Sequence, residues 1–88
     1  MIWRIEFSES ARKQLGKLDR QVQKEIRDYL RKRIGTEEDP RRFGEALLRN
    51  LSGLWKYRVG PYRVICRIEE SRVTVLVLRV GHRREVYQ

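Results

Sequence analysis

The C-terminal stretch, residues 54–88, places the strongest constraint on the fold of this chain. Near its start, Trp55 and Tyr57 alternate with Lys56 and Arg58. An alternation with period two is typical of a β-strand whose two faces meet different surroundings. We therefore expect the aromatic side chains to face a core, and Lys56 and Arg58 to point together away from it.

Two further strands are expected in the same stretch. The Gly60–Pro61 pair is a turn signal, and residues 62–68 alternate again, with Arg63 on the face opposite the apolar residues. Residues 73–78 are apolar on both faces, which favours a central strand. We expect this strand to end at residues 79–81 and a basic tail to follow.

The N-terminal half predicts one strand and a helical hairpin. Residues 2–7 alternate like a strand, and Ser8 is expected to cap the helix that follows. Apolar residues at helical spacing predict two helices, the first with Ala11, Leu15 and Leu18, the second with Val22, Ile26, Tyr29, Leu30 and Ile34. Asp19 is expected to cap the second helix and Gly35 to end it.

The order of these elements is β-α-α-β-β-β, which indicates an α+β fold. We expect a single domain over residues 1–88: a small, twisted, mostly antiparallel sheet of about four strands with the helical hairpin on one face. Residues 35–43 are expected to form a surface loop, and residues 45–51 a helical turn that packs Leu47, Leu48 and Leu51. The second sheet face would be open and basic.

The charge of the chain points to a polyanionic partner. Its 88 residues include 21 Lys and Arg against 12 Asp and Glu, a formal net charge of +9. Residues 49–88 carry nine basic and three acidic side chains, a net +6, whereas residues 1–48 carry twelve and nine, a net +3. The excess is therefore expected on the strands and tail, where it would attract nucleic acid, a ribonucleoprotein or another anionic partner.

Several functional classes find little support in the sequence. One His and one Cys cannot form a zinc site, no carboxylates are clustered with metal-ligand spacing, and there is no phosphate-binding glycine loop. Cys66 alternates with apolar neighbours and is expected to be a buried structural thiol. The N-terminus lacks the apolar run of a signal peptide, so we expect a cytoplasmic protein. From the residue types above we expect it to need neither metal nor cofactor. We do not expect a membrane among its partners.

The basic residues suit chemistry on RNA. RNA carries its own nucleophile, the 2′-OH, so a protein can cleave it by positioning and proton transfer alone. Lys56, Arg58, Arg63 and Arg83 could surround the scissile phosphate, and His82 and Tyr87 could move protons.

Each of these residues also has an ordinary structural explanation. Arg63 could pair with Glu69 or Glu85, His82 could be a turn residue, and Tyr87 could anchor the C-terminus. Three further arginines are expected to be simple surface charges: Arg67, Arg72 and Arg79.

The chain resembles the RelE/ParE superfamily of toxin–antitoxin toxins, and within it the RelE branch. The resemblance covers essentially the whole chain, and the order and spacing of its parts carry it. Those parts are Phe7–Ala11, Leu15–Asp19, Leu51–Val59, Tyr62–Ile65 and Val80–Tyr87.

This resemblance implies a ribosome-dependent endoribonuclease that cuts mRNA in the ribosomal A site through attack by the 2′-OH. Its partners would be mRNA, the ribosome and a RelB-like antitoxin. By this resemblance the phosphate would be held and neutralised by Lys56, Arg58 and Arg63. Arg83 would help to protonate the leaving oxygen, and Tyr87 or Lys56 would accept the proton of the 2′-OH. A guanidinium is a poor base, so Arg58 is expected to stabilise charge rather than move protons.

One departure from the best-known RelE pattern, His82, and the register of the tail leave its residues open to more than one assignment. Related toxins use a histidine near the C-terminus, so His82 could share the proton transfer. Arg84 could take the role of Arg83 in a different register. The main rival reading is a ParE-type inhibitor of DNA gyrase with the same fold and no nuclease activity. A plain RNA- or DNA-binding module is the third.

Overall fold

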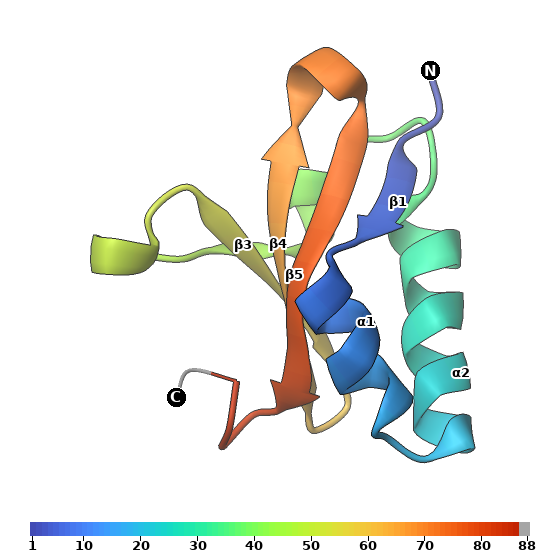
Figure 1. Cartoon of the computed structure of the whole chain (residues 1–88). Coiled ribbons are helices and arrows are strands. Elements are labelled where there is room, and N and C mark those ends of the chain that lie inside the picture. The colour runs from blue at the N-terminus through green and yellow to red at the C-terminus, as the bar shows by residue number, and fades with distance from the viewer. Residues whose placement is uncertain (87–88) are drawn as a thin grey trace.

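The structure, a computed structural model, describes residues 1–86 (Figure 1). Its main elements are β1 (Arg4–Phe7), α1 (Glu9–Gly16), α2 (Arg20–Tyr29), β2 (Glu45–Ala46), β3 (Leu54–Val59), β4 (Tyr62–Glu69) and β5 (Thr74–His82). The strands form one five-stranded sheet in the order β1-β5-β4-β3-β2. β1 pairs with β5 in parallel, and the other neighbours are antiparallel. The expected α+β class is confirmed, with one strand more than expected.

The helical hairpin forms where the sequence predicts it. The Ser8 hydroxyl accepts a hydrogen bond from the backbone N–H of Ala11 at 3.1 Å, so Ser8 caps α1 as expected. Asp19 occupies the N-cap position of α2, but its side chain makes no capping hydrogen bond. A π-helical turn, Leu30–Ile34, continues α2, and the Gly35 N–H closes it by donating to the Leu30 carbonyl at 2.8 Å.

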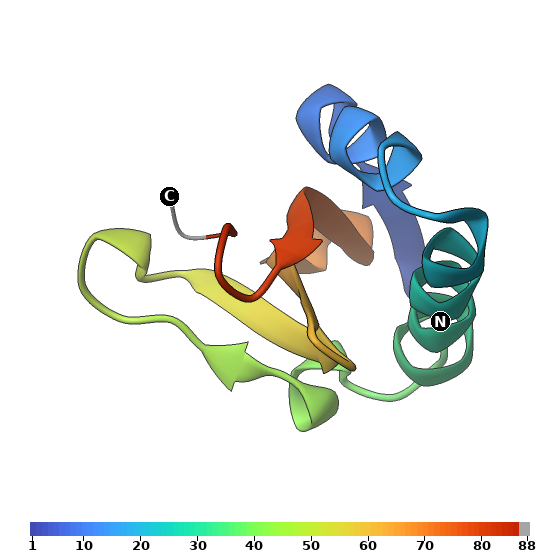
Figure 2. The ribbon, with the colours of Figure 1, turned by 90° about the horizontal axis from the view of Figure 1, so that it is seen from below.

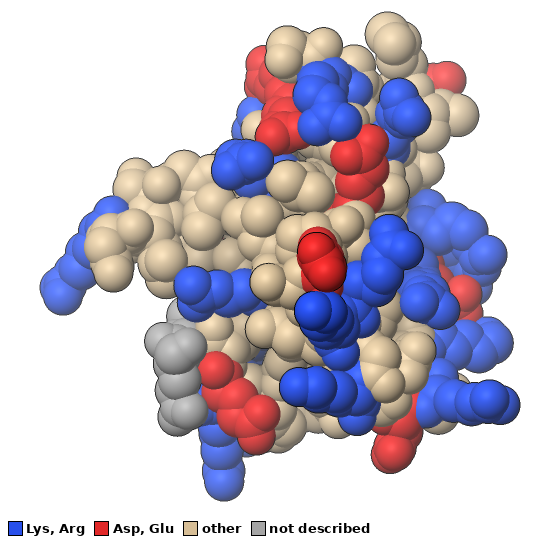
Figure 3. All heavy atoms as spheres, viewed as in Figure 1, with Lys and Arg blue, Asp and Glu red and all other residues tan. Residues whose placement is uncertain are grey.

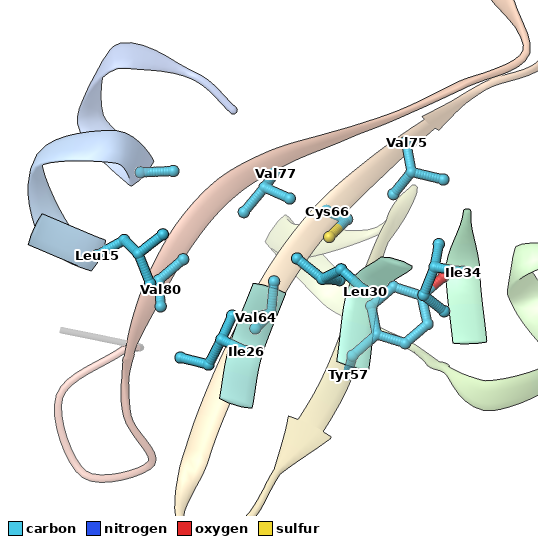
Figure 4. Packing of buried hydrophobic residues seen from close by; sticks show 11 residues of the cluster. Leu15, Ile26, Leu30, Ile34, Tyr57, Val64, Cys66, Val75, Val77 and Val80 are labelled. Atoms are coloured by element: carbon cyan, nitrogen blue, oxygen red, sulfur yellow. The ribbon is translucent and has the colours of Figure 1, made fainter. Parts of the chain in front are cut away.

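The core lies between the helices and one face of the sheet (Figure 4). Tyr57, Val64 and Cys66 point into it from β3 and β4, which confirms the alternation read from the sequence. Burial raises the pKa of the Cys66 thiol, as befits a structural cysteine. The Tyr57 hydroxyl is buried too and donates a 2.6 Å hydrogen bond to the carbonyl of Pro40.

The prediction of a helical turn at residues 45–51 is wrong. Residues 45 and 46 form β2, which pairs with β3, and a 3₁₀ helix, Arg49–Leu51, follows. Leu48 is 77% exposed rather than packed. Leu47 and Leu51 are half-buried, because the loop projects from the body of the protein, and β2 supplies hydrogen-bond partners for the edge of β3 (Figure 2). The expected loop at 35–43 also contains a 3₁₀ helix, Pro40–Phe43.

The last strand is longer than the sequence indicates. β5 continues to His82, and its pairing with β4 shifts by one residue: Cys66 faces Val77, but Ile65 faces Arg79. Leu78 is thus an extra residue in a β-bulge, which reverses the face on which later side chains lie. The simple alternation expected from the sequence cannot register such an insertion.

Beyond the end of β1, the outer edge of β5 is covered by α1. The Gln14 side chain accepts a 2.8 Å hydrogen bond from the backbone N–H of Val80. A strand edge without such a partner would present unpaired polar groups to solvent or to another chain. Across residues 1–86, no helix has both the length and the apolar character needed to cross a membrane.

We predict that Tyr57→Phe lowers the free energy of unfolding by about 1–3 kcal/mol, because it leaves the buried Pro40 carbonyl without its donor. Urea denaturation measures this change. Tyr62→Phe is the matched control, since the Tyr62 hydroxyl makes no hydrogen bond within residues 1–86. Equal stability of the two variants would contradict a structural role for the Tyr57–Pro40 bond.

Candidate nucleic-acid interface

The sheet face away from the helices carries basic side chains in two cross-strand rows. Lys56 lies opposite Ile65, which lies opposite Arg79, and Arg58 lies opposite Arg63. Directly opposed residues of antiparallel strands lie close enough for their side chains to interact. We call the cluster of Lys56, Arg58, Arg63 and Arg79 the open-face cluster. The sequence predicted its first three members.

Glu45 on β2 holds two members of the open-face cluster. Its carboxylate lies 3.0 Å from Arg58 Nε and 3.7 Å from Lys56 Nζ. The Lys56 side chain is only 15% exposed, whereas those of Arg58 and Glu45 are more than half exposed. Glu45 therefore sets the positions of both cations and competes with any phosphate that approaches them.

Arg63 points along the turn between β3 and β4. Its Nη1 atom donates to the carbonyls of Gly60 and Tyr62, both at 2.9 Å. Within residues 1–86 it pairs with neither Glu69 nor Glu85, the partners considered from the sequence. These two bonds use only one nitrogen, so the guanidinium keeps further N–H groups for an anion.

Arg83 lies beside the same turn. Its backbone N–H donates to the carbonyl of Pro61 at 2.9 Å, and its side chain is exposed. The fold therefore brings Arg63 and Arg83, which are far apart in the sequence, to one end of the open-face cluster. Arg84 is exposed as well.

Arg79 is the site residue that sequence analysis missed. It was expected to be an unremarkable surface charge, yet the bulge at Leu78 turns it to the same face as Lys56. Its Nη1 atom lies 3.5 Å from the carbonyl of Val86. Ile65 lies between Lys56 and Arg79 and is only 2% exposed, so the two cations are separated by a buried apolar side chain. The sequence holds no clear signal of the bulge that would have revealed this placement.

The start of the tail folds back beside the open-face cluster. Val86 is 6% exposed, and a Cβ at Gly81, which lies opposite Arg63, would meet its side chain at 3.9 Å. In Figure 2 the chain after β5 runs on the side of that strand away from α2. Tyr87 follows directly but lies outside the described residues.

His82 lies on the opposite side of the sheet from these cations. It pairs with Tyr62, and the two rings meet edge to face with centroids 5.9 Å apart. Both residues line a hollow beside Lys17 and Leu18, at the end of α1, and Arg79 and Val86 line the same hollow from the end of β5 and the start of the tail. His82 Nδ1 accepts a 3.3 Å hydrogen bond from the Arg84 N–H. The structure thus separates His82 from Lys56 and Arg58, with which it was grouped.

Two expected surface arginines do behave as ordinary surface charges. Arg67 pairs with Glu69 at 3.1 Å, and Arg72 pairs with Glu69 at 2.6 Å and with Glu6 at 3.0 Å. Burial is the largest single influence on Glu69 and raises its pKa, but the hydrogen bonds and charges of Arg67 and Arg72 together outweigh it and lower that pKa below its usual value. No three His, Cys, Asp or Glu side chains of residues 1–86 gather closely enough to hold a metal ion.

Comparison with known proteins identifies the family. Residues 5–87 match the family model described as the ParE toxin of the type II toxin–antitoxin system parDE. The chain is 33% identical to the toxin RelG of Mycobacterium tuberculosis over 88 residues, which cover 100% of this chain and 99% of that protein. The chain belongs to the RelE/ParE toxin superfamily. It is therefore a toxin of a type II toxin–antitoxin system.

Solved structures of this superfamily share the fold. The toxin–antitoxin complex RelBE2 of M. tuberculosis contains a chain with a TM-score of 0.86 and 30% identity, covering 97% of this chain and 95% of that one. The isolated RelE toxin of E. coli has a TM-score of 0.70 and 25% identity, covering 97% of this chain and 90% of that one. The RelE-like fold expected from the resemblance is confirmed.

We predict that Glu45→Gln strengthens binding to single-stranded RNA and makes it more salt-dependent, because the carboxylate that competes for Lys56 and Arg58 is removed. Fluorescence anisotropy with a labelled oligonucleotide, titrated at several salt concentrations, measures the effect. Glu70→Gln removes the same charge from an exposed residue that pairs with Arg41 and serves as control. Equal gains in both variants would show that only net charge matters.

Proposed function

We propose that this toxin is a ribosome-dependent endoribonuclease, which cleaves mRNA in the ribosomal A site and so inhibits translation. The observation that carries this proposal is the open-face cluster, which gathers cations from three strands on one sheet face. Such an array can stabilise the extra negative charge of a pentacoordinate phosphate without a metal ion. The named relatives RelG and RelE, similar over nearly the whole chain, add support.

The proposed reaction is an attack by the 2′-oxygen on the adjacent phosphorus, in which the new bond forms as the bond from phosphorus to the 5′-oxygen breaks and that oxygen takes up a proton. Lys56, Arg58 and Arg63 bind the phosphate oxygens, and Arg79 extends this array along the row of Lys56. Arg83, beside the turn that also holds Arg63, assists the departure of the 5′-oxygen. Tyr87 or Lys56 accepts the 2′-OH proton.

His82 takes a reduced part in this proposal. Its ring packs against Tyr62 on the helix side of the sheet, so it reaches the scissile phosphate only if the RNA or the tail passes around the end of β5. The open face therefore offers many cations but few groups that transfer protons. For this reason we propose that the ribosome completes the site by fixing the mRNA in a reactive conformation.

The proposed protein partner is a RelB-like antitoxin. Complexes of RelE-type toxins with such antitoxins are among the structural neighbours of this chain. A toxin with a net charge of +9 is suited to an antitoxin with an acidic segment that folds along its surface. A small neighbouring gene that encodes such a protein, and that rescues cells from the toxin, is the expected finding.

A second candidate function is inhibition of DNA gyrase, and the family model that carries the ParE name favours it. Expression of the toxin in growing cells, followed by mapping of mRNA 5′ ends, separates the two functions. We predict new ends within translated codons and unchanged supercoiling activity of gyrase in vitro. Inhibited gyrase together with intact mRNA would replace the nuclease by the gyrase inhibitor.

We predict that purified toxin cleaves mRNA rapidly on programmed ribosomes and only slowly as free RNA, because the open face lacks a complete acid–base pair. Single-turnover cleavage with and without ribosomes measures the difference. Rapid cleavage of naked RNA, unchanged by added ribosomes, would mean that the chain carries the full catalytic apparatus itself.

We predict that Arg63→Gln and Arg79→Gln each lower the single-turnover rate on ribosomes, the first by about 10²–10³-fold, since it removes a donor to the developing charge. A smaller loss is expected for Arg79→Gln, which lies further from the turn. Arg67→Gln is the matched control, because Arg67 is also on β4 but is held by Glu69. An Arg79→Gln rate equal to that of the control would remove Arg79 from the site.

We also predict that Tyr87→Phe lowers the cleavage rate strongly while ribosome binding persists, since only the hydroxyl is lost. His82→Gln should have a smaller effect, because its ring lies on the other side of the sheet. The same single-turnover assay ranks both variants. If both cut at the wild-type rate, proton transfer does not come from the tail, and Lys56 becomes the candidate base.

A further inference from the structure

A second basic surface lies on the helical layer, away from the open-face cluster. Residues 9–34 carry nine Lys and Arg against four Asp and Glu, a net charge of +5. All nine of these basic side chains are exposed, and Figure 3 shows Lys and Arg gathered over α1 and α2. The expectation that the excess charge belongs to the strands and tail is therefore incomplete, because the helices carry nearly as much.

Four of these cations form a stripe along α2. Arg20, Lys24, Arg27 and Arg31 follow one another at intervals of four, three and four residues, and Arg31 belongs to the π-helical turn that continues the helix. Residues at this spacing lie on one side of a helix, and the stripe is about 16 Å long at 1.5 Å per residue. The core-facing side of the helix is marked by Ile26, which is fully buried.

Asp28 borders the stripe and holds two of its members. Its carboxylate lies 2.9 Å from Lys24 Nζ and 3.0 Å from Arg31 Nη2. The hydrogen bond from Lys24 lowers the pKa of Asp28, so this carboxylate is ionised at neutral pH. Arg20 and Arg27 make no ion pair or side-chain hydrogen bond with any of residues 1–86. The stripe thus keeps a net positive charge, with two cations available to a ligand.

The chemistry around the stripe indicates what kind of ligand fits it. Among residues 1–86, the exposed large apolar residues are Met1, Ile2, Phe43 and Leu48, and residues 9–34 contribute none of them. The Phe43 ring packs against Arg33, which is outside the stripe. A protein partner usually needs aromatic or aliphatic anchors at the centre of its interface. Single-stranded RNA needs exposed aromatic rings on which its bases stack. The phosphate backbone of a duplex needs only cations at regular spacing.

We propose that the outer face of α2 is a second nucleic-acid surface, which binds the phosphate backbone of double-stranded RNA. The choice of RNA rests on the proposed function, since a toxin inside the ribosome would be surrounded by ribosomal RNA helices. In this arrangement the open-face cluster binds the single-stranded substrate, and the stripe on α2 binds a structural RNA helix. This surface would contact phosphates only, so its binding would not depend on the base sequence of the duplex.

The test uses the full-length chain with Lys56→Gln and Arg63→Gln, in which the open-face contacts are weakened. Binding to a short blunt-ended RNA duplex is measured by anisotropy over a range of salt concentrations. Adding Arg20→Gln and Arg27→Gln should lower the slope of log K against log salt by about 2, or about 1 per lost phosphate contact. Asp28→Asn should instead raise the slope, by about 2 if both freed cations, Lys24 and Arg31, contact phosphates, and tighten binding.

The matched control is Arg67→Gln with Arg72→Gln, which removes the same charge from paired arginines elsewhere on the surface. An equal loss of slope in this control, or no loss in the α2 variant, would overturn the proposal. So would tighter binding to a DNA duplex than to the RNA duplex, or binding of poly-glutamate that depends equally on Arg20 and Arg27.

This test is independent of the nuclease assay. The duplex titration measures RNA binding by the α2 surface in the variant with Lys56→Gln and Arg63→Gln. Cleavage on ribosomes measures the activity of the open-face cluster in the wild-type chain. Loss of the slope effect with intact cleavage overturns the α2 proposal alone. A slope effect without any cleavage leaves the α2 surface standing as a backbone-binding site and overturns the proposed nuclease.

Discussion

The pairing of β5 with β1 on one side and β4 on the other joins the two ends of the chain into one sheet. The place of Arg79 in the open-face cluster depends on this arrangement, whereas Lys56, Arg58 and Arg63 are brought together by the pairing of β3 with β4. β4 and β5 place Ile65 between Lys56 and Arg79, and the bulge at Leu78 decides that Arg79, rather than Val80, faces away from the helices. The same pairing places Val80 in the core, where it packs with Leu15 of α1 (Figure 4).

Much of this fold could be predicted because its signals are local. The Ser8 cap, the apolar spacing of the helices and the alternation in β3 and β4 each depend on a few neighbouring residues. What could not be predicted depends on distant partners. β2 forms because β3 offers it an unpaired edge, and neither the bulge at Leu78 nor the ion pairs of Glu45 can be read from residues adjacent in sequence.

The candidate site shows the same division. Strand alternation correctly grouped Lys56, Arg58 and Arg63 on one face, because none of them lies beyond an irregularity. His82 and Arg79 lie after the bulge, where that alternation no longer holds. Arg79, expected to be a simple surface charge, joins the open-face cluster, and His82, expected in the site, lies on the helix side of the sheet. The charge of this basic face is partly neutralised by a carboxylate of the same sheet. Glu45 on β2 pairs with Lys56 and Arg58 and so lowers the repulsion between them before any ligand binds.

The parallel pairing of the first strand with the last has a consequence for how the protein is made. Arg4 pairs with Thr74, so β1 has no strand partner until residues 74–77 have been synthesised. Contacts between such distant segments form late, because closing the long loop between them must precede any gain from pairing. The open-face cluster is also completed late, because one of its members, Arg79, lies on β5 and cannot join Lys56 across Ile65 before that strand has been synthesised.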